Sequence, residues 1–124
     1  TAPRVLGSSG QLETVFMNII SNAIDAMPEG GTLTVRTEHL SREGKVELAI
    51  QDTGCGINKK DIPYIFNPYF TTKPAGKGTG LGLSIAQLTI QSHRGSIEVD
   101  SEIGRGTTFK IKLPVYRESL PLGR

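Results

Sequence analysis

The chain has 124 residues, with 14 Lys and Arg against 12 Asp and Glu and a formal net charge of +2. This length suits one domain with a single core. The nearly balanced charge, without a basic run or basic residues interleaved with aromatic ones, argues against a nucleic-acid partner. The single Cys55 excludes an internal disulfide and a cysteine-based zinc site.

We expect a soluble, cytoplasmic piece, because the sequence shows no signal peptide and no apolar run approaching ~18 residues. This expectation leaves open whether the piece belongs to a parent protein that is anchored in a membrane. The lone Cys55 fits a reducing compartment and is expected to be a small, half-buried loop residue.

The first predicted element is an amphipathic helix that opens near Ser8. Ser8 and Gln11 have the spacing of a capping box. Apolar residues then recur in steps of three and four at Leu12, Val15, Phe16, Ile19, Ile20, Ala23, Ile24 and Met27. The helix should stop at residues 28–31, where the sequence is Pro-Glu-Gly-Gly.

Two segments of alternating polarity follow this helix. They contain Leu33, Val35 and Thr37, and then Val46, Leu48 and Ile50, with polar residues 41–44 between them. The pattern predicts a hairpin with one face on the core, against which the helix packs. Residues 58–77 form a long connection with little regular structure, which is typical of a functional or disordered loop.

A second helix is predicted from about residue 80 to residue 92. It ends at His93, which would help to cap its C-terminus, and Gly95 would supply the left-handed cap. A second hairpin follows, with apolar positions at Ile97, Val99, Phe109, Ile111 and Leu113 around a turn at residues 104–106. The order of elements predicts an α+β fold: a two-layer α/β sandwich with one mixed sheet covered on one face by helices.

The most informative segment is the glycine-rich run before the second helix. Gly76, Gly78, Gly80 and Gly82 occupy every second position and lead directly into the helix. Glycine permits positive φ and close approach to a ligand, and the first helical turn offers unpaired N–H groups. A polyphosphate is the expected ligand, although neither the P-loop pattern nor the dinucleotide-binding glycine fingerprint is present.

Two further clusters carry polar chemistry. Asn18, Asn22 and Asp25 are spaced four and three apart on the first helix, which predicts either a solvated face or a site for a hard cation such as Mg²⁺. Asp52 begins a segment Asp-Thr-Gly-Cys-Gly-Ile that is, read alone, a good turn. Together with the other segments it predicts an adenine pocket, in which the carboxylate accepts from an exocyclic amine and the glycines let a flat ring approach.

Five segments in this order resemble the N, G1, F, G2 and G3 boxes of sensor histidine kinases. They are residues 18–23, 52–56, 65–70, 78–83 and 104–109, so the resemblance covers about residues 12–113. Each segment alone is a modest signal, but the five in this order and spacing are highly specific. The Asn-Ala-x-x-Ala-Met and Phe-x-Pro-Tyr-Phe-Thr-Thr-Lys variants look most like the nitrogen-regulator type. The resemblance implies the Bergerat fold of the gyrase, chaperone, kinase and mismatch-repair superfamily, with a linker remnant at residues 1–10, the catalytic ATP-binding domain at 11–115 and a tail at 116–124.

The resemblance implies ATP and Mg²⁺ as ligands. Asn22 would bind the metal, Asn18 would help to hold the phosphates, and Asp52 would accept from the adenine amine. The other implied nucleotide contacts are Asp25, Gly54, Gly56, Ile57, Phe70, Gly78, Thr79, Gly80, Leu81, Gly82, Leu83 and Thr108, with Gly56 and Thr108 lining the base through water. Phe66 and Phe70 would anchor the lid, and Lys73 or Lys77 would reach the γ-phosphate unless each is a solvated loop charge.

Two positions depart from the resembled pattern. Many histidine kinases carry a basic residue where this chain has Asp25, so neutralisation of the phosphates leans on Mg²⁺ and the lid lysines. Superfamily members that hydrolyse ATP place a glutamate where this chain has Asn18. Because an amide cannot act as a general base near neutral pH, we expect slow hydrolysis.

The phosphoacceptor is expected on a separate, histidine-bearing dimerisation domain. His39 and His93 are followed by Leu and Arg and not by the acidic residue that the resemblance requires. A response regulator would receive the phosphate, the parent would be a homodimer, and this fragment a monomer. Two alternatives stay open: a non-enzymatic ATP-binding switch, and a serine/threonine kinase of the anti-sigma type on the same fold.

Overall fold

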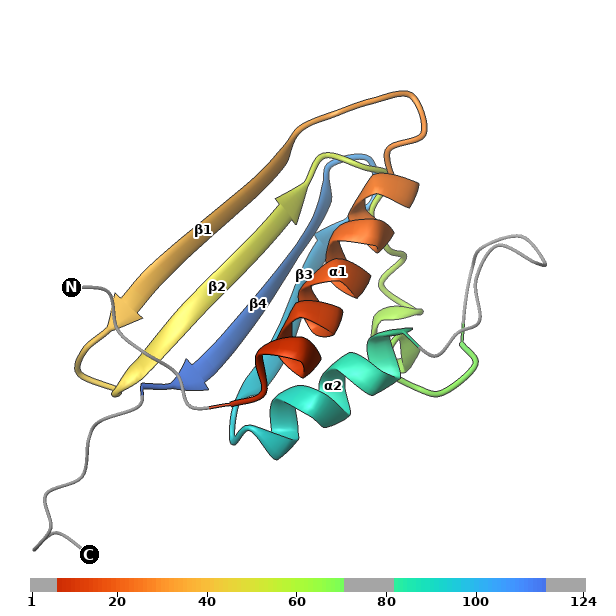
Figure 1. Cartoon of the computed structure of the whole chain (residues 1–124). Coiled ribbons are helices and arrows are strands. Elements are labelled where there is room, and N and C mark those ends of the chain that lie inside the picture. The colour runs from red at the N-terminus through yellow and green to blue at the C-terminus, as the bar shows by residue number, and fades with distance from the viewer. Residues whose placement is uncertain (1–6, 71–81, 116–124) are drawn as a thin grey trace, which may run out of the picture.

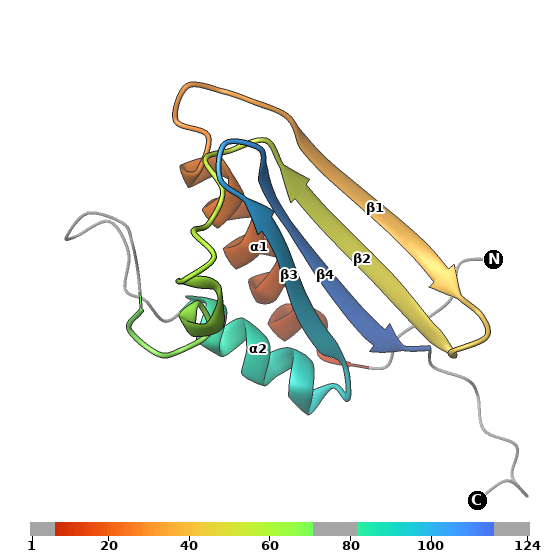
Figure 2. The same cartoon turned by 180° about the vertical axis from the view of Figure 1, so that it is seen from behind.

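The structure is a computed structural model, in which residues 7–70 and 82–115 are described. The elements in chain order are α1 (Ser9–Asp25), β1 (Leu33–Leu40), β2 (Lys45–Asp52), the 3₁₀ helix η1 (Ile62–Tyr64), α2 (Gly82–Ser92), β3 (Ser96–Glu102) and β4 (Gly106–Pro114). The strands form one sheet in the order β1-β2-β4-β3. Both α-helices lie on one face of this sheet (Figures 1 and 2).

The predicted two-layer α+β fold is confirmed, with one refinement to the sheet. The sequence predicted a mixed sheet, whereas all three described strand pairs are antiparallel. The reason is that each half of the sheet is a hairpin, and the second hairpin places β4 antiparallel against β2. The two central strands, β2 and β4, are therefore neighbours although they are distant in the sequence. Asp52 at the end of β2 and Thr107 near the start of β4 are 55 positions apart in the chain.

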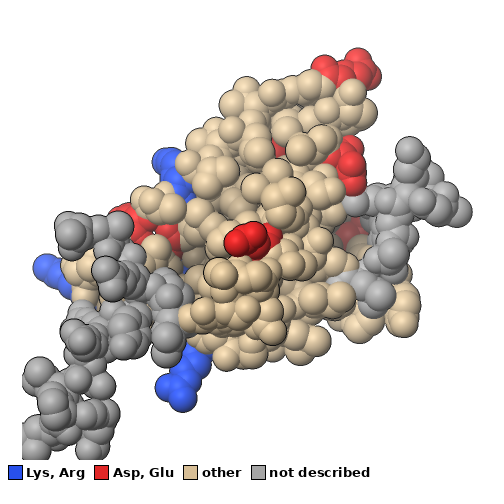
Figure 3. All heavy atoms as spheres, in the orientation of Figure 1, with Lys and Arg blue, Asp and Glu red and all other residues tan. Residues whose placement is uncertain are grey.

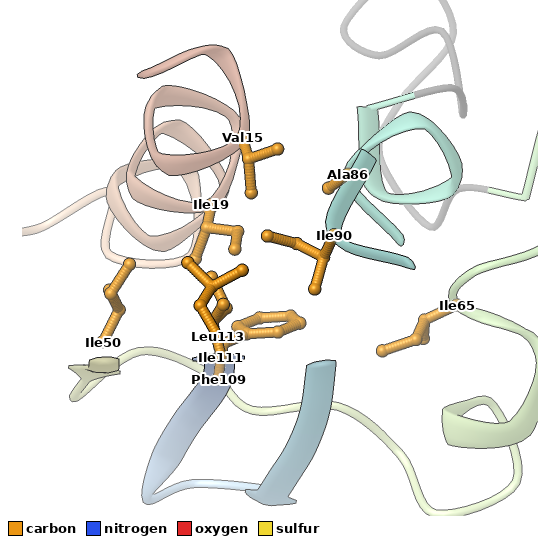
Figure 4. Close-up of a cluster of buried hydrophobic side chains, with 9 residues drawn as sticks. All are labelled: Val15, Ile19, Ile50, Ile65, Ala86, Ile90, Phe109, Ile111 and Leu113. Carbon is orange, nitrogen blue, oxygen red and sulfur yellow. The ribbon is translucent and has the colours of Figure 1, made fainter. Parts of the chain in front are cut away.

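The core lies between the helices and the central strands (Figure 4). It is formed by apolar side chains from both helices, from β2 and β4, and from the segment after η1: Val15, Ile19, Ile50, Ile65, Ala86, Ile90, Phe109, Ile111 and Leu113. Burial of an aliphatic or aromatic side chain of this size contributes about 1.5–3 kcal/mol. The core therefore fixes α1 and α2 on the sheet, and with them the residues that they carry.

The prediction that both strands of the first hairpin turn one face to the core is wrong for β1. Val35 is 51% exposed, and the interior residues of the strand are exposed on both faces. The reason is that β1 is an edge strand, which lies away from the helices in both views (Figures 1 and 2), while α1 packs over β2. Ile24, counted to the apolar face of α1, is likewise 57% exposed.

The start of α1 is capped by the residue that the sequence predicts, whereas the end of α2 differs from the prediction. The Ser8 side chain accepts from the Gln11 backbone N–H at 3.3 Å, as the capping box predicts. At the end of α2, Arg94 and not Gly95 takes the left-handed conformation, with φ +63°. The N–H of Gly95 donates to the Ile90 carbonyl at 2.9 Å, which is the long bond of a Schellman motif. Gly95 is needed for a different reason, because a Cβ there would collide with the Lys112 carbonyl.

The connection after β2 has little regular structure over its described part, residues 53–70, as predicted. It contains only η1 and a series of turns. Phe66 and Phe70 pack against the core, and the Phe66 ring meets Phe109 edge-on at 6.5 Å between centroids. Cys55 lies exposed in this segment, which contradicts the half-buried position expected for it.

Candidate functional site

The polar stripe of α1 lies between two segments that the sequence singled out. At one end, Asn18 Nδ2 donates to the carbonyl of Gly82, the first residue of α2, at 3.4 Å. At the other end, the carbonyl of Ala26 accepts from the N–H of Cys55 at 3.1 Å. These two attachments are about 12 Å apart along the helix at a rise of about 1.5 Å per residue. The half-buried Asn22 therefore stands between the end of the glycine-rich run and the loop after β2.

Asp52 ends β2 beneath this loop and is 4% exposed. Its Oδ1 accepts from the backbone N–H of Gly54 at 2.8 Å and of Thr107 at 3.3 Å. Both of these bonds use the same carboxylate oxygen, so Oδ2 keeps its acceptor capacity for a further donor. A buried carboxylate held in this way is suited to accept from an amine of a ligand.

The structure places Thr107, and not Thr108, beside Asp52. Thr107 is 5% exposed and shares the inner face of β4 with Phe109, whereas Thr108 faces the opposite side of the sheet. The Asp52 carboxylate accepts from the Thr107 backbone. The signal was present in the sequence, because the alternation of Phe109, Ile111 and Leu113 assigns odd-numbered residues to the inner face.

Two glycines of the loop after β2 lie against the backbone of neighbouring segments. Their lack of a side chain is therefore needed for packing as well as for the approach of any ligand. A Cβ on Gly54 would lie 2.5 Å from the Ala26 carbonyl oxygen, and one on Gly56 would collide with the carbonyl of Glu102. Gly104 N–H donates to the Cys55 carbonyl at 2.9 Å. The loop after β2 is thus held between the end of α1 and the turn of the β3–β4 hairpin.

Ser101 is a residue of this site that the sequence interpretation missed. Its hydroxyl accepts from the N–H of Ile57 at 2.7 Å, donates to the Gly106 carbonyl at 3.0 Å and lies 2.8 Å from Thr107 Oγ1. It therefore joins the far end of the loop to β4. No pattern within β3 distinguishes this serine from an ordinary strand residue.

The remaining predicted site residues divide into two groups. Ile57, Phe70 and Leu83 are half-buried and pack against the core, and Asp25 is exposed on α1. Lys73, Lys77, Gly78, Thr79, Gly80 and Leu81 lie outside the described residues.

The two helices carry almost no charge. The only charged residues of α1 are Glu13 and Asp25, and α2 has none. Figure 3 shows the same on the helix side of the molecule, where charged residues gather mainly at the margin of the described surface. Neither helix therefore supplies a cation to a phosphate group.

The donor set is compatible with Mg²⁺ only if a ligand provides most of the oxygens. Within residues 7–70 and 82–115 no group of three or more His, Cys, Asp or Glu is placed to hold a metal. Mg²⁺ commonly takes one or two protein oxygens and completes its shell with waters and phosphates. The amide oxygen of Asn22 fits such a part-protein site.

Comparison with known proteins assigns the family. Residues 7–117 match the family described as "Histidine kinase-, DNA gyrase B-, and HSP90-like ATPase". The chain belongs to this family. The resemblance of the sequence to the ATP-binding domain of histidine kinases is thereby confirmed.

The similar proteins include a sensor kinase and a sporulation kinase. The chain is 46% identical over 118 residues to sensor kinase CckA of Brucella abortus and 40% identical over 117 residues to sporulation kinase E of Bacillus subtilis. These alignments cover 85% and 94% of this chain but only 12% and 15% of those proteins. The chain thus spans a small part of the curated relatives. These two relatives are a sensor kinase and a sporulation kinase, so the nitrogen-regulator subtype is not supported.

Two solved structures show the same fold. The mycobacterial sensor histidine kinase MprB matches with a TM-score of 0.79 at 33% identity, covering 90% of this chain and 74% of that one. Full-length ShkA in complex with AMPPNP matches with a TM-score of 0.82 at 27% identity, covering 97% of this chain and 25% of that one. Among the residues of the present chain that the structure describes, no helix combines the length and apolarity needed to cross a membrane.

Proposed function

We propose that this domain binds Mg·ATP and donates the γ-phosphoryl group to a histidine on a separate dimerisation domain of its parent protein. A response regulator then takes the phosphoryl group from that histidine. The observation that carries the proposal is that both segments proposed to contact the nucleotide are attached to α1 or its C-cap. Asn18 bonds to Gly82, and the C-cap residue Ala26 bonds to Cys55. The similarity to sensor kinases supports the reaction.

The proposed roles follow the order of the site along α1. Asp52 accepts from the adenine amine at the end near Ala26, and the residues from 78 to 82 hold the phosphates at the end near Asn18. Asn22 lies between these ends and supplies an oxygen to Mg²⁺. When bound, the metal neutralises phosphate charge. Because α1 and α2 carry no cation, Lys73 and Lys77 are the proposed source of the remaining positive charge.

The chain's own residues position ATP and do not take part covalently. The lone pair of a neutral imidazole nitrogen on the acceptor forms a bond to the γ-phosphorus, the bond to the β–γ bridging oxygen breaks, and ADP leaves. The imidazole proton passes to solvent or to an acidic neighbour on the acceptor domain. Positioning and charge neutralisation account for most of the catalysis in such transfers. Since Asn18 cannot activate water, transfer to histidine is favoured over hydrolysis.

Binding is tested by titration calorimetry of ATP with and without Mg²⁺. Asn22→Ala should weaken the binding of Mg·ATP and leave metal-free binding nearly unchanged. Asp52→Ala should lower the preference for adenine over guanine nucleotides. A domain that releases no heat with ATP, or an Asp52→Ala variant with the parent's base preference, refutes the corresponding role.

Transfer is tested by adding the isolated dimerisation domain of the parent and γ-labelled ATP. Label on that domain that is lost in acid and stable in base identifies phosphohistidine and supports the proposal. Binding without any transfer indicates a nucleotide-operated switch, and acid-stable label on a serine of a protein partner indicates a kinase of the anti-sigma type. Either of these two results refutes the histidine kinase assignment.

A further inference from the structure

Three polar side chains form a row across the sheet at the base-binding end of the site. Ser101 is paired with Thr107 between β3 and β4. The register of β2 with β4, in which Gln51 faces Thr108, continues to place Asp52 opposite Thr107. All three side chains share the helix-facing side with the core row of Ile50, Phe109 and Val99 that lies next to them. Side chains directly opposite each other in antiparallel strands have Cβ atoms about 4.5–5.5 Å apart.

The hydrogen bonds of Ser101 determine the direction of the Thr107 hydroxyl. The Ile57 N–H can only donate, so Ser101 Oγ accepts from it. The Gly106 carbonyl can only accept, so it takes the single hydroxyl proton of Ser101. The 2.8 Å contact between Ser101 Oγ and Thr107 Oγ1 must then use the proton of Thr107. The Thr107 oxygen is left with lone pairs alone.

We infer that Ser101 is a positioning residue that makes this end of the site acceptor-only and so sets its preference for a 6-amino purine over a 6-oxo purine. This inference rests on the proposed binding of ATP. Asp52 and Thr107 then both present lone pairs toward the base. An amine donates to such a pair, whereas a carbonyl oxygen in its place faces two acceptors and is left unpaired. Ser101 acts through Thr107 and does not itself contact the base.

The test compares the affinities of Mg·ATP and Mg·ITP, whose base carries a carbonyl in place of the amine, by titration calorimetry. Ser101→Ala releases the Thr107 proton, which then donates to the carbonyl of ITP, so the ratio of ATP to ITP affinity should fall about fivefold, the worth of one hydrogen bond. Ser101→Thr keeps a hydroxyl and should keep the ratio of the parent. Equal weakening of both nucleotides in Ser101→Ala indicates a merely structural role and overturns the inference, as does a Ser101→Thr variant that behaves like Ser101→Ala.

A second variant covers the case in which Ser101→Ala does not fold. Thr107→Val has nearly the same shape but no acceptor, and it should lower the same ratio. Where Ser101→Ala folds, adding it to Thr107→Val should leave the ratio unchanged, because the residue through which Ser101 acts is gone. A further change in the double variant overturns the inference. A parent domain that binds neither nucleotide refutes the proposed function, whereas a parent that prefers ATP while Ser101→Ala and Thr107→Val retain its ratio refutes only the role of Ser101.

Discussion

The structure predicts that His93 fastens the start of α1 to the end of α2, and that His93→Ala loosens this joint. His93 Nδ1 lies 2.8 Å from the Thr89 carbonyl, which can only accept, so Nδ1 carries the proton. Nε2 is then the acceptor for the N–H of Ser8 at 3.1 Å. One neutral ring therefore connects the N-cap of α1 with the last turn of α2, and Gly7 lies against the same ring.

The expected loss of stability follows from these two bonds. A neutral hydrogen bond contributes about 0.5–1.5 kcal/mol net. The bond to Thr89 is part-buried and is taken at about 1 kcal/mol, while the bond from Ser8 is exposed and is taken at about 0.5 kcal/mol. His93→Ala should therefore lower the free energy of unfolding by about 1.5 kcal/mol, or Tm by roughly 6–12 °C in a domain of about 100 residues.

Urea and thermal unfolding followed by circular dichroism measure this loss in the absence of nucleotide. Hydrogen exchange shows where in the structure the stability is lost. The Ser8 amide and the amides in the first turn of α1 should exchange faster in His93→Ala. The matched control is His39→Ala, whose ring is exposed on the edge strand β1 and which should change stability by less than about 0.5 kcal/mol. Equal effects of the two substitutions, or unchanged exchange at Ser8, would show that the joint does not form.

Three further predictions test the site and its frame. Thr107→Val should weaken ATP binding several-fold while Thr108→Val leaves it unchanged in the same calorimetric titration, and the reverse order would contradict the assignment of faces on β4. Arg94→Gly should raise the free energy of unfolding, measured in urea, by about 0.5–1 kcal/mol. Glycine adopts the left-handed conformation of residue 94 without strain, and this gain exceeds the entropy that glycine adds to the unfolded chain. A loss of stability in Arg94→Gly would contradict this prediction. Gly106→Ala should destabilise the domain by more than about 2 kcal/mol, because its φ is +124° and a Cβ would meet the Asp52 carbonyl. Gly104→Ala is the control, since it has positive φ but open space around it, and should cost only about 1 kcal/mol.

The sequence by itself determined the elements and the chemical character of the site. Steps of three and four from Leu12 onward specify α1, and alternation around Phe109 specifies β4, because these periods follow from the local geometry of one helix or one strand. Ser8 with Gln11 marked the helix start for the same local reason. The order and spacing of the five segments resembling kinase boxes were enough to predict the family, since they depend on residue types and positions in the sequence alone.

The tertiary structure alone decided which elements are neighbours. Val35 alternates like a core residue, yet it is exposed because β1 became the edge strand beyond the reach of α1. The role of Ser101 depends on β4 lying between β2 and β3, and the joint at His93 unites residues 85 positions apart. Local periodicity assigns a side chain to a face of its own element. The residue that it contacts across that face depends on which strands pair and on where the helices pack. These contacts join segments that are distant in the sequence, so no short stretch of sequence determines them.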